Sequence, residues 1–315
     1  MKLETLRKLV IQSLFADDDF FDLFTLKGGN ALLVHKINAR ASIDIDVSME
    51  NSFEDKDLDS TQQKFEKSLK DTFSRENYTV IDVKLKKKPK KMPKEKEKFW
   101  GGYTLEFKIV SLENKSKLDS GSITLAKLRN LALSVEDSTL TSSTGGKVFK
   151  VDISKYEYCK SKIEKDLDGF PIYVYTPIAI VYEKLRAICQ QHEEYNNYVE
   201  TNRKPRARDF FDIYTVLEFH NGIVPTIKKD ILKESNLNDL VNIFTLKKVP
   251  LDFLSKVKNY RDFHRENFIS VKDTVSESVT LESYDFYFDY VSKLCNQLSN
   301  ELANLNMLDN IPSND

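Results

Sequence analysis

The stretch LKGGNALLVHKINARASIDIDV, Leu26 to Val47, decides the fold of this 315-residue chain. Two adjacent glycines come before a short apolar segment, and the stretch ends on Asp44 and Asp46, each placed between apolar neighbours. Side chains of a β-strand alternate between its two faces, so both aspartates are expected on one face while the apolar residues enter a core on the other. The pattern therefore predicts a half-buried strand, from Ser42 to the end of the stretch, that carries a pair of carboxylates.

These carboxylates need a compensating cation, because two acids this close stay ionised in a partly buried site only when positive charge offsets them. A ligand set made only of oxygens favours Mg²⁺ or Mn²⁺. Gly28 and Gly29 stand directly before a helix that is predicted from about Asn30 to Lys36, and backbone amides at such a start can hold a phosphate group. The two features together indicate phosphoryl or nucleotidyl transfer. Taken singly, each is better explained as a plain turn or as a solvated edge strand.

Composition sets the protein class and the expected organisation. Hydrophobic residues make up 40% and charged residues 31% of the chain, as in globular proteins. The apolar runs are too short to cross a bilayer, and the amino terminus turns to aspartates before a secretory segment forms, so we expect a cytoplasmic protein without a membrane partner. Length and pattern predict an α/β domain over residues 1–170 and a mostly helical domain over residues 171–315.

Local signals place the main elements. Helices are predicted near residues 3–15 and 60–75, and strands at residues 78–85, 103–112 and 147–154. The lysine-rich segment KLKKKPKKMPKEKEK, residues 84–98, connects the first two of these strands. Such a run is most often a solvated loop, but its charge density also suits a phosphate backbone. Thr176 and Pro177 are expected as the N-cap and first residue of a later helix.

Four blocks of sequence carry a family resemblance. KGGNAL followed by RASIDIDV resembles the start of the AbiEii/AbiGii toxin family, a branch of the polymerase-beta-like nucleotidyltransferase superfamily. YEKLRAI and RARDFFDIYTV resemble that family's later motifs, a lysine on one helix and an Arg-Asp-x-x-Asp helix. The resemblance covers residues 26 to 219 and implies a small mixed β-sheet nucleotidyltransferase core flanked by helices, followed by a helical domain. Asn30 departs from the pattern, since the family usually carries a small hydroxyl residue there.

The resemblance implies roles for individual residues. Asp44 and Asp46 would bind metal ions, Mg²⁺ or Mn²⁺, that bridge a nucleoside triphosphate and the attacking hydroxyl. Lys184 would reach a triphosphate oxygen, and Asp209 would face the same cleft. The residues that would hold the nucleotide are Gly28, Gly29, Asn30, Arg40, Ser42 and Lys184. The plain alternative for the Arg-Asp-x-x-Asp helix is a surface ion-pair helix, in which Arg208 pairs with Asp212 at i,i+4.

A third carboxylate is expected from a neighbouring strand, and two acids qualify. Asp152 and Glu106 each alternate with apolar residues in their strands, so both face away from an apolar side. The family resemblance favours Asp152, because it places an acid on the strand before the helical half. Periodicity alone leaves both open, and either can be an ordinary outward-facing acid.

The resulting hypothesis is a nucleotidyltransferase of the toxin type that uses a nucleoside triphosphate and transfers the nucleotide to an RNA or protein hydroxyl. By resemblance, the RNA acceptor would be the 3′ end of transfer RNA, and a cognate antitoxin would be a partner. The first alternative is a small-molecule nucleotidyltransferase of the antibiotic-modifying kind. The second is a module that keeps the fold and only binds nucleic acid or protein.

Overall fold

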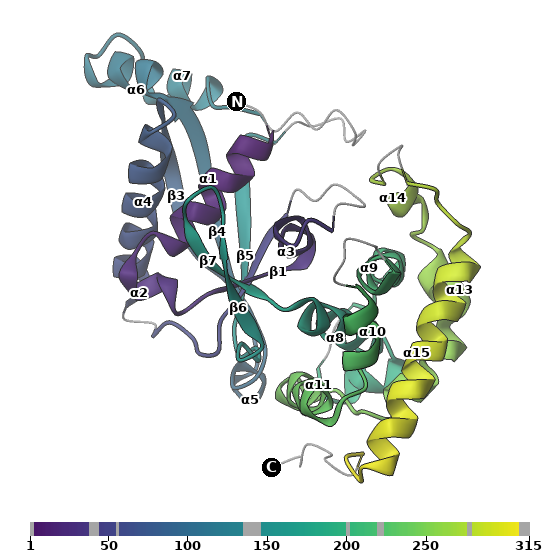
Figure 1. The fold of residues 1–315 in the computed structure, drawn as a ribbon. Helices are drawn as coiled ribbons and strands as arrows, with labels where there is room; N and C mark the ends of the chain where they lie inside the picture. Colours follow the sequence, from purple (N-terminus) through teal and green to yellow (C-terminus); the bar gives the residue numbers. More distant parts are fainter. Residues whose placement is uncertain are drawn as a thin grey trace.

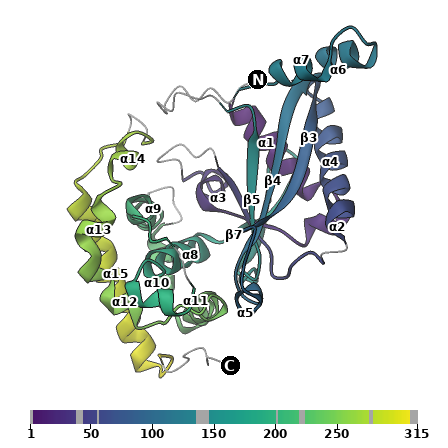
Figure 2. The same cartoon turned by 180° about the vertical axis from the view of Figure 1, so that it is seen from behind.

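The structure is a computed structural model that describes residues 3–37, 44–54, 57–134, 146–199, 202–218, 224–275 and 279–308. A mixed sheet with flanking helices forms the first half of the chain, and a helical region lies beside it (Figure 1). The same division is visible from behind in Figure 2. The predicted fold class, an α/β sheet core followed by a mostly helical region, is therefore confirmed.

Within the described residues, seven strands form one mixed sheet in the order β3-β4-β5-β2-β1-β7-β6. β2 runs parallel to β5 and β1 runs parallel to β7, whereas the other neighbours are antiparallel. The strands are β1 Thr25–Lys27, β2 Ile45–Ser48, β3 Tyr78–Lys88, β4 Gly102–Ser111, β5 Phe149–Ser154, β6 Lys162–Asp166 and β7 Pro171–Tyr175. The centre of the sheet therefore joins segments that are far apart in the sequence.

The two long helices of the first half, α1 and α4, each bury an apolar stripe. The helix predicted near residues 3–15 is present as α1, and it packs against α4. α4 places Phe65, Leu69 and Phe73 at intervals of four on the buried side, the spacing of a helix face. The bounds are α1 Leu3–Phe15, α2 Asp18–Phe21, α3 Gly28–Val34, α4 Leu58–Ser74, α5 Lys94–Glu97, α6 Leu112–Asp119 and α7 Leu125–Asn130.

The helical region begins at α8, immediately after the sheet. Thr176 caps this helix by accepting a hydrogen bond from the amide of Ala179, and Pro177 is its first residue, as predicted. The predicted domain limit at residue 170 falls just before β7, which pairs with β1 and so belongs to the sheet. The α-helices are α8 Pro177–Cys189, α9 Ala207–Glu218, α10 Val224–Asp230, α11 Glu234–Leu246, α12 Phe253–Lys256, α13 Arg261–Arg265, α14 Ile269–Lys272 and α15 Tyr284–Asn304.

The long helix α15 closes the outer side of the helical region and packs against α9 (Figure 1). The rings of Phe210 and Phe288 stack there with centroids 5.3 Å apart. In the described part of the chain, none of the helices combines the length and apolarity needed to cross a membrane.

Candidate active site

A row of polar side chains crosses the centre of the sheet. Asp46 on β2 is the register partner of Asp152 on β5, and on its other side it is the partner of Lys27 on β1. Thr104 on β4 is the register partner of Asp152 and donates its Oγ1 hydrogen to Asp152 Oδ1 at 2.9 Å. Register partners share a face, and adjacent strands lie about 4.8 Å apart. The two aspartates are therefore neighbours on one face of the sheet.

Gly28 lets the chain turn directly against this row. Its φ of +67° lies in the left-handed region, and a Cβ atom at this position would stand 3.0 Å from Asp46 Oδ2. Both facts favour glycine, because an L side chain would be strained and would press on the carboxylate. Gly29 follows it in the first turn of α3.

Asn30 holds the main chain just before β2 in place. It is buried, and its Nδ2 donates a hydrogen bond to the main-chain carbonyl of Asp44 at 2.7 Å. The structure thus shows a positioning contact for the Asn30 amide, in contrast to the phosphate contact that the resemblance implies. Asp44 itself is exposed and lies just before β2.

The carboxylate pair carries an electrostatic strain. Burial raises the pKa of the Asp46 carboxyl; Lys27 opposes this shift, whereas the negative charges of Asp152 and Asp44 add to it. A divalent cation would relieve this repulsion, and an all-oxygen ligand set fits Mg²⁺ or Mn²⁺. As arranged, the described residues contain no group of three His, Cys, Asp or Glu side chains that could hold a metal ion.

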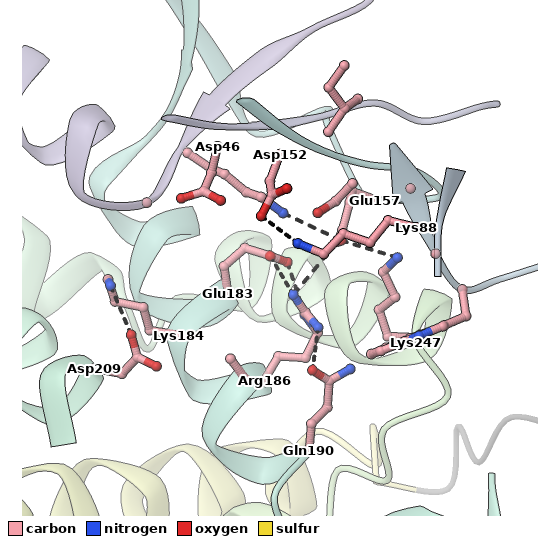
Figure 3. A pocket seen from close by; sticks show the side chains of 18 of the residues that line it. Asp46, Lys88, Asp152, Glu157, Glu183, Lys184, Arg186, Gln190, Asp209 and Lys247 are labelled. Carbon is pink, nitrogen blue, oxygen red and sulfur yellow. Dashed lines mark hydrogen bonds and ion pairs between the residues drawn. The ribbon is translucent and has the colours of Figure 1, made fainter. Parts of the chain in front are cut away.

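Lys88 supplies a positive charge that contacts Asp152 directly. It is the last residue of β3, and its Nζ donates to Asp152 Oδ2 at 2.7 Å (Figure 3). Both oxygens of Asp152 are therefore engaged, one by Lys88 and one by Thr104. An ammonium group occupies one side of the carboxylate that a metal ion would need.

The opposite wall comes from the helical region, where Lys184 on α8 meets Asp209 and Asp212 on α9. Lys184 Nζ donates to Asp209 Oδ1 at 3.0 Å and to Asp212 Oδ2 at 2.6 Å. Arg206 Nε donates to the second oxygen of Asp209 at 2.5 Å. Burial by itself would raise the pKa of Asp209, but Arg206 and Lys184 hold it below its usual value. Asp209 is thus an ionised anchor for two cations.

A cavity of about 680 Å³ separates the two walls, a size typical of small-molecule sites. The sheet wall contributes the carboxylate pair and Gly28, and the helical wall contributes Lys184 and Asp209. Figure 3 shows the two acids of the sheet on one side of this space and the Lys184–Asp209 pair on the other. Further cavity residues that carry charge or aromatic surface are Lys27, Lys88, Trp100, Tyr103, Glu157, Tyr175, Glu183, Arg186, Lys204, Arg206 and Lys247.

A buried ion network forms the floor of the cavity (Figure 3). Glu157 Oε1 lies 3.2 Å from Lys247 Nζ, and Glu157 Oε2 lies 3.8 Å from Arg186 Nη2. Arg186 also binds both oxygens of Glu183, at 3.2 and 2.7 Å. Although burial opposes ionisation, Lys247, Lys27 and Arg186 lower the pKa of Glu157 to about 2. This network joins the sheet to the helical region.

Similarity to a known family agrees with this geometry. A family profile described as the nucleotidyl transferase AbiEii toxin of a type IV toxin–antitoxin system matches residues 10–289. The chain belongs to the AbiEii family. This AbiEii-family protein is therefore a nucleotidyltransferase of the toxin–antitoxin class, as the sequence resemblance implies.

The solved structures that are similar to the AbiEii-family protein have low sequence identity to it. A candidate nucleotidyltransferase from H. pylori is 13% identical, with a TM-score of 0.46 and 96% of each chain covered. JHP933 from Helicobacter pylori is 13% identical, with a TM-score of 0.46 over 96% of this chain and 93% of that one. An antigenic nucleotidyltransferase-like protein from Paracoccidioides brasiliensis is 11% identical, with a TM-score of 0.31 over 75% of this chain and 92% of that one. No curated protein matches significantly.

The predicted site residues of this AbiEii-family nucleotidyltransferase fall into three groups. The structure brings Gly28, Asp46, Asp152, Lys184 and Asp209 to the one cavity. Gly29, Asn30 and Asp44 are close in sequence to cavity residues but do not line the cavity. Arg40 and Ser42 lie outside the described residues.

Glu106, the other candidate for the third carboxylate, lies farther along β4, two residues beyond Thr104. Its register partner on β5 is Lys150, and its carboxylate pairs with Lys86 and Lys150. It does not line the cavity. Sequence reasoning missed the charged residues Lys27, Lys204 and Arg206, and it included Lys88 only as part of the lysine-rich segment. A signal was present for Arg206, which is the first residue of the RARDFFDIYTV block and can reach Asp209 at i,i+3.

Proposed function

We propose that this protein is a metal-dependent nucleotidyltransferase that moves a nucleotide from a nucleoside triphosphate to a hydroxyl group of an RNA acceptor, with the 3′ end of transfer RNA as the first candidate. The observation that carries the proposal is the position of Asp46 beside Asp152, facing Lys184 and Asp209 across one cavity. Carboxylates opposite cations are the arrangement that a metal-bound triphosphate requires.

The residues divide the task by their chemistry. Asp46 and Asp152, with Asp44 beside them, would hold Mg²⁺ or Mn²⁺, which neutralises triphosphate charge and activates the acceptor hydroxyl when bound. Lys184 and Arg206 present donors from the helical wall, and Asp209 holds both in place. Gly28 and Gly29 keep the backbone open beside the carboxylates, so that their amides can approach phosphate oxygens.

An RNA acceptor is favoured over a small molecule by the mouth of the cavity. Lys88 and Pro89 line the cavity, so the lysine-rich segment reaches its edge. The segment continues outward through exposed lysines, which attract a phosphate backbone without reading its sequence. A small cationic antibiotic would be repelled by the same charges. Family membership further supports a cognate antitoxin as a partner, and we propose that the enzyme acts in the cytoplasm.

The decisive test measures transfer of labelled nucleotide to total transfer RNA in the presence of magnesium. Asp46→Asn and Asp152→Asn should each lower the rate by about two orders of magnitude or more, because several kcal/mol of transition-state stabilisation is lost. Glu106→Gln is the matched control, since it alters an acid on the adjacent strand outside the cavity. It should keep the wild-type rate.

Two results would refute the proposal. The first is the absence of transfer to any RNA by the wild-type protein with all four nucleoside triphosphates. The second is equal transfer by the wild-type protein and Asp46→Asn. Transfer to a small hydroxyl compound but not to RNA would mean that the acceptor is a small molecule. The proposed role of Asp46 and Asp152 in metal binding would then stand.

A further inference from the structure

A second, smaller cavity lies beside the proposed active site, under the lysine-rich connection between β3 and β4. Its volume is about 150 Å³. This is well below the range of about 300–1,000 Å³ that is typical of sites for whole ligands, so it suits one group of a longer ligand. The residues that line it are Ser52, Phe53, Lys87, Lys88, Pro89, Lys90, Met92, Glu97, Gly102, Tyr103, Lys155 and Tyr156.

The two cavities share part of their walls. Lys88, Pro89, Gly102 and Tyr103 line both of them. A ligand that extends out of the active-site cavity along this wall therefore enters the smaller cavity next. For an acceptor strand whose terminal hydroxyl lies near Asp152, the groups that follow the hydroxyl along the strand would lie in the smaller cavity.

The charge of the small cavity selects an anion. Four lysines line it against one carboxylate, that of Glu97. In the described part of the chain, neither Lys90 nor Lys155 forms an ion pair. The Lys155 ammonium group lies 5.0 Å from the centre of the Tyr156 ring, and the Tyr156 hydroxyl donates to Ser52 Oγ at 3.2 Å. Lys90 and Lys155 are therefore available to an incoming phosphate.

Lys88 connects the two cavities chemically. Its ammonium group is bound to Asp152 Oδ2 at 2.7 Å, and 59% of its side chain is exposed, so it is free to change partners. A metal ion at the carboxylate pair needs the oxygen that Lys88 now holds. A phosphate in the small cavity would offer Lys88 another anionic partner on the wall that it already lines.

We propose that the small cavity binds a phosphodiester group of the acceptor strand, and that Lys88 transfers from Asp152 to this phosphate when the strand binds. The proposal rests on the proposed function, because it assumes an acceptor with a phosphodiester backbone. It assigns Lys88 as a positioning residue that frees the metal-binding oxygen only when an acceptor is present.

The binding test uses a fluorescently labelled oligocytidylate and the Asp46→Asn protein, because the test measures binding alone and does not depend on nucleotide transfer. Lys90→Met with Lys155→Met should weaken binding at least fivefold. It should also lower the slope of log affinity against log salt by about 0.7 for each phosphate that the variant no longer neutralises. Lys127→Met is the matched control, because Lys127 is exposed on α7, at the far end of β4 from the hairpin connection (Figure 1). It should leave affinity and slope unchanged.

The partner exchange has its own readout, the affinity for Mn²⁺ measured by electron paramagnetic resonance with Asp46 intact. Oligocytidylate should raise Mn²⁺ affinity in the wild-type protein. Lys88→Met should raise it without RNA and abolish the RNA effect. Equal Mn²⁺ affinity with and without RNA in the wild-type protein would overturn the exchange.

The outcomes separate this proposal from the proposed function. If no nucleotide is transferred to RNA but the salt slope falls only in the Lys90→Met, Lys155→Met protein, the small cavity binds RNA phosphate and the proposed function fails. If RNA is modified but the slopes of this variant and of Lys127→Met are equal, the phosphate site is overturned. Competition by polyglutamate as strong as that by unlabelled oligocytidylate would also overturn it, since the site would then respond to charge alone.

Discussion

Replacing Lys184 with methionine tests whether the helical wall of the site is held together by its ion pairs. Lys184 Nζ contacts Asp209 at 3.0 Å and Asp212 at 2.6 Å, and the three side chains are 9%, 7% and 1% exposed. Lys184→Met keeps the length and apolar stem of the side chain but removes one of the cations that contact this buried carboxylate pair. Breaking a buried pair in this way costs about 3–5 kcal/mol, because a charge is left uncompensated away from water. We expect the free energy of unfolding to fall by that amount.

The assay is urea unfolding at pH 7.5 and pH 5, with Lys70→Met as the control. Lys70 pairs with Glu66 at i,i+4 on the exposed side of α4, so its removal should cost only about 0.3–0.5 kcal/mol. In the wild-type protein the lowered pKa of Asp209 contributes stability above the unfolded pKa of about 3.9, and this stability is lost as pH falls through the folded pKa. Without Lys184 the folded pKa rises, so the deficit of the variant should be largest at pH 7.5 and smaller at pH 5.

Adding Asp212→Asn to Lys184→Met should restore part of the lost stability, because the amide fills the same volume without the buried charge. The double variant should stay inactive if Lys184 also serves the triphosphate. A deficit below about 1 kcal/mol that is the same at both pH values would refute the reasoning, since it would mean that the pair is effectively solvated.

Two further substitutions test the sheet wall and the core beside α9. Gly28→Ala should abolish most transfer activity, because a Cβ atom would lie 3.0 Å from Asp46 Oδ2. Gly121→Ala is the control, since Gly121 has a similar φ of +73° and an added Cβ atom would have no atom within 4 Å. It should have the same backbone strain of about 1 kcal/mol and keep full activity. Burial lowers the pKa of His264 to about 3, so this ring is neutral in the native protein while the unfolded chain takes up a proton below about pH 6.5. Stability should therefore fall by up to about 1.4 kcal/mol per pH unit below that value, and His264→Phe should flatten this part of the urea-unfolding profile; an unchanged slope would show that His264 titrates normally.

The local elements of the site could be predicted from the sequence because short-range rules govern them. The α1 helix follows from apolar spacing, and the Thr176 cap with Pro177 follows from chemistry at the helix start. Alternation in the strand placed Asp46 on the face opposite the core. β6 and β7 were not predicted, since each is only five residues long. β7 joins the sheet through β1, which is far away in the sequence, and β6 pairs with β7.

The choice between Asp152 and Glu106 shows where pattern reasoning ends. Both acids alternate correctly within their strands, so periodicity treats them alike. Register separates them, because β5 pairs in parallel with β2 and sets Asp152 opposite Asp46, whereas Glu106 lies opposite Lys150. Register between strands about a hundred residues apart is a property of the whole sheet.

Tertiary partners also changed the expected pairing on α9. The i,i+4 rule allows Arg208 to pair with Asp212. In the structure, Lys184 from α8 donates to Asp212, and Arg208 Nε donates to Ser270 Oγ at 3.1 Å. A local rule cannot anticipate a lysine that comes from another helix. The resemblance to family motifs, in contrast, implied that Lys184 and Asp209 face the same cleft.

The charges around the cavity explain why Lys88 matters to the free protein. On the floor, Lys27, Arg186 and Lys247 outnumber Glu157 and Glu183 by one positive charge. On the helical wall, Lys184 and Arg206 offset Asp209 and Asp212.

The sheet wall carries the remaining excess of negative charge, that of Asp46 and Asp152. Lys88 and the surplus positive charge on the floor together match these two carboxylates, and Lys204, which also lines the cavity, leaves one positive charge in excess before any ligand binds. A metal ion that enters alone must compete with Lys88 for Asp152, and it adds positive charge to a site that has no negative charge in excess. A metal ion that arrives with a triphosphate brings its own counter-charge, and an acceptor phosphate gives Lys88 a new partner. The charge balance thus favours binding of metal, nucleotide and acceptor together over binding of the metal alone.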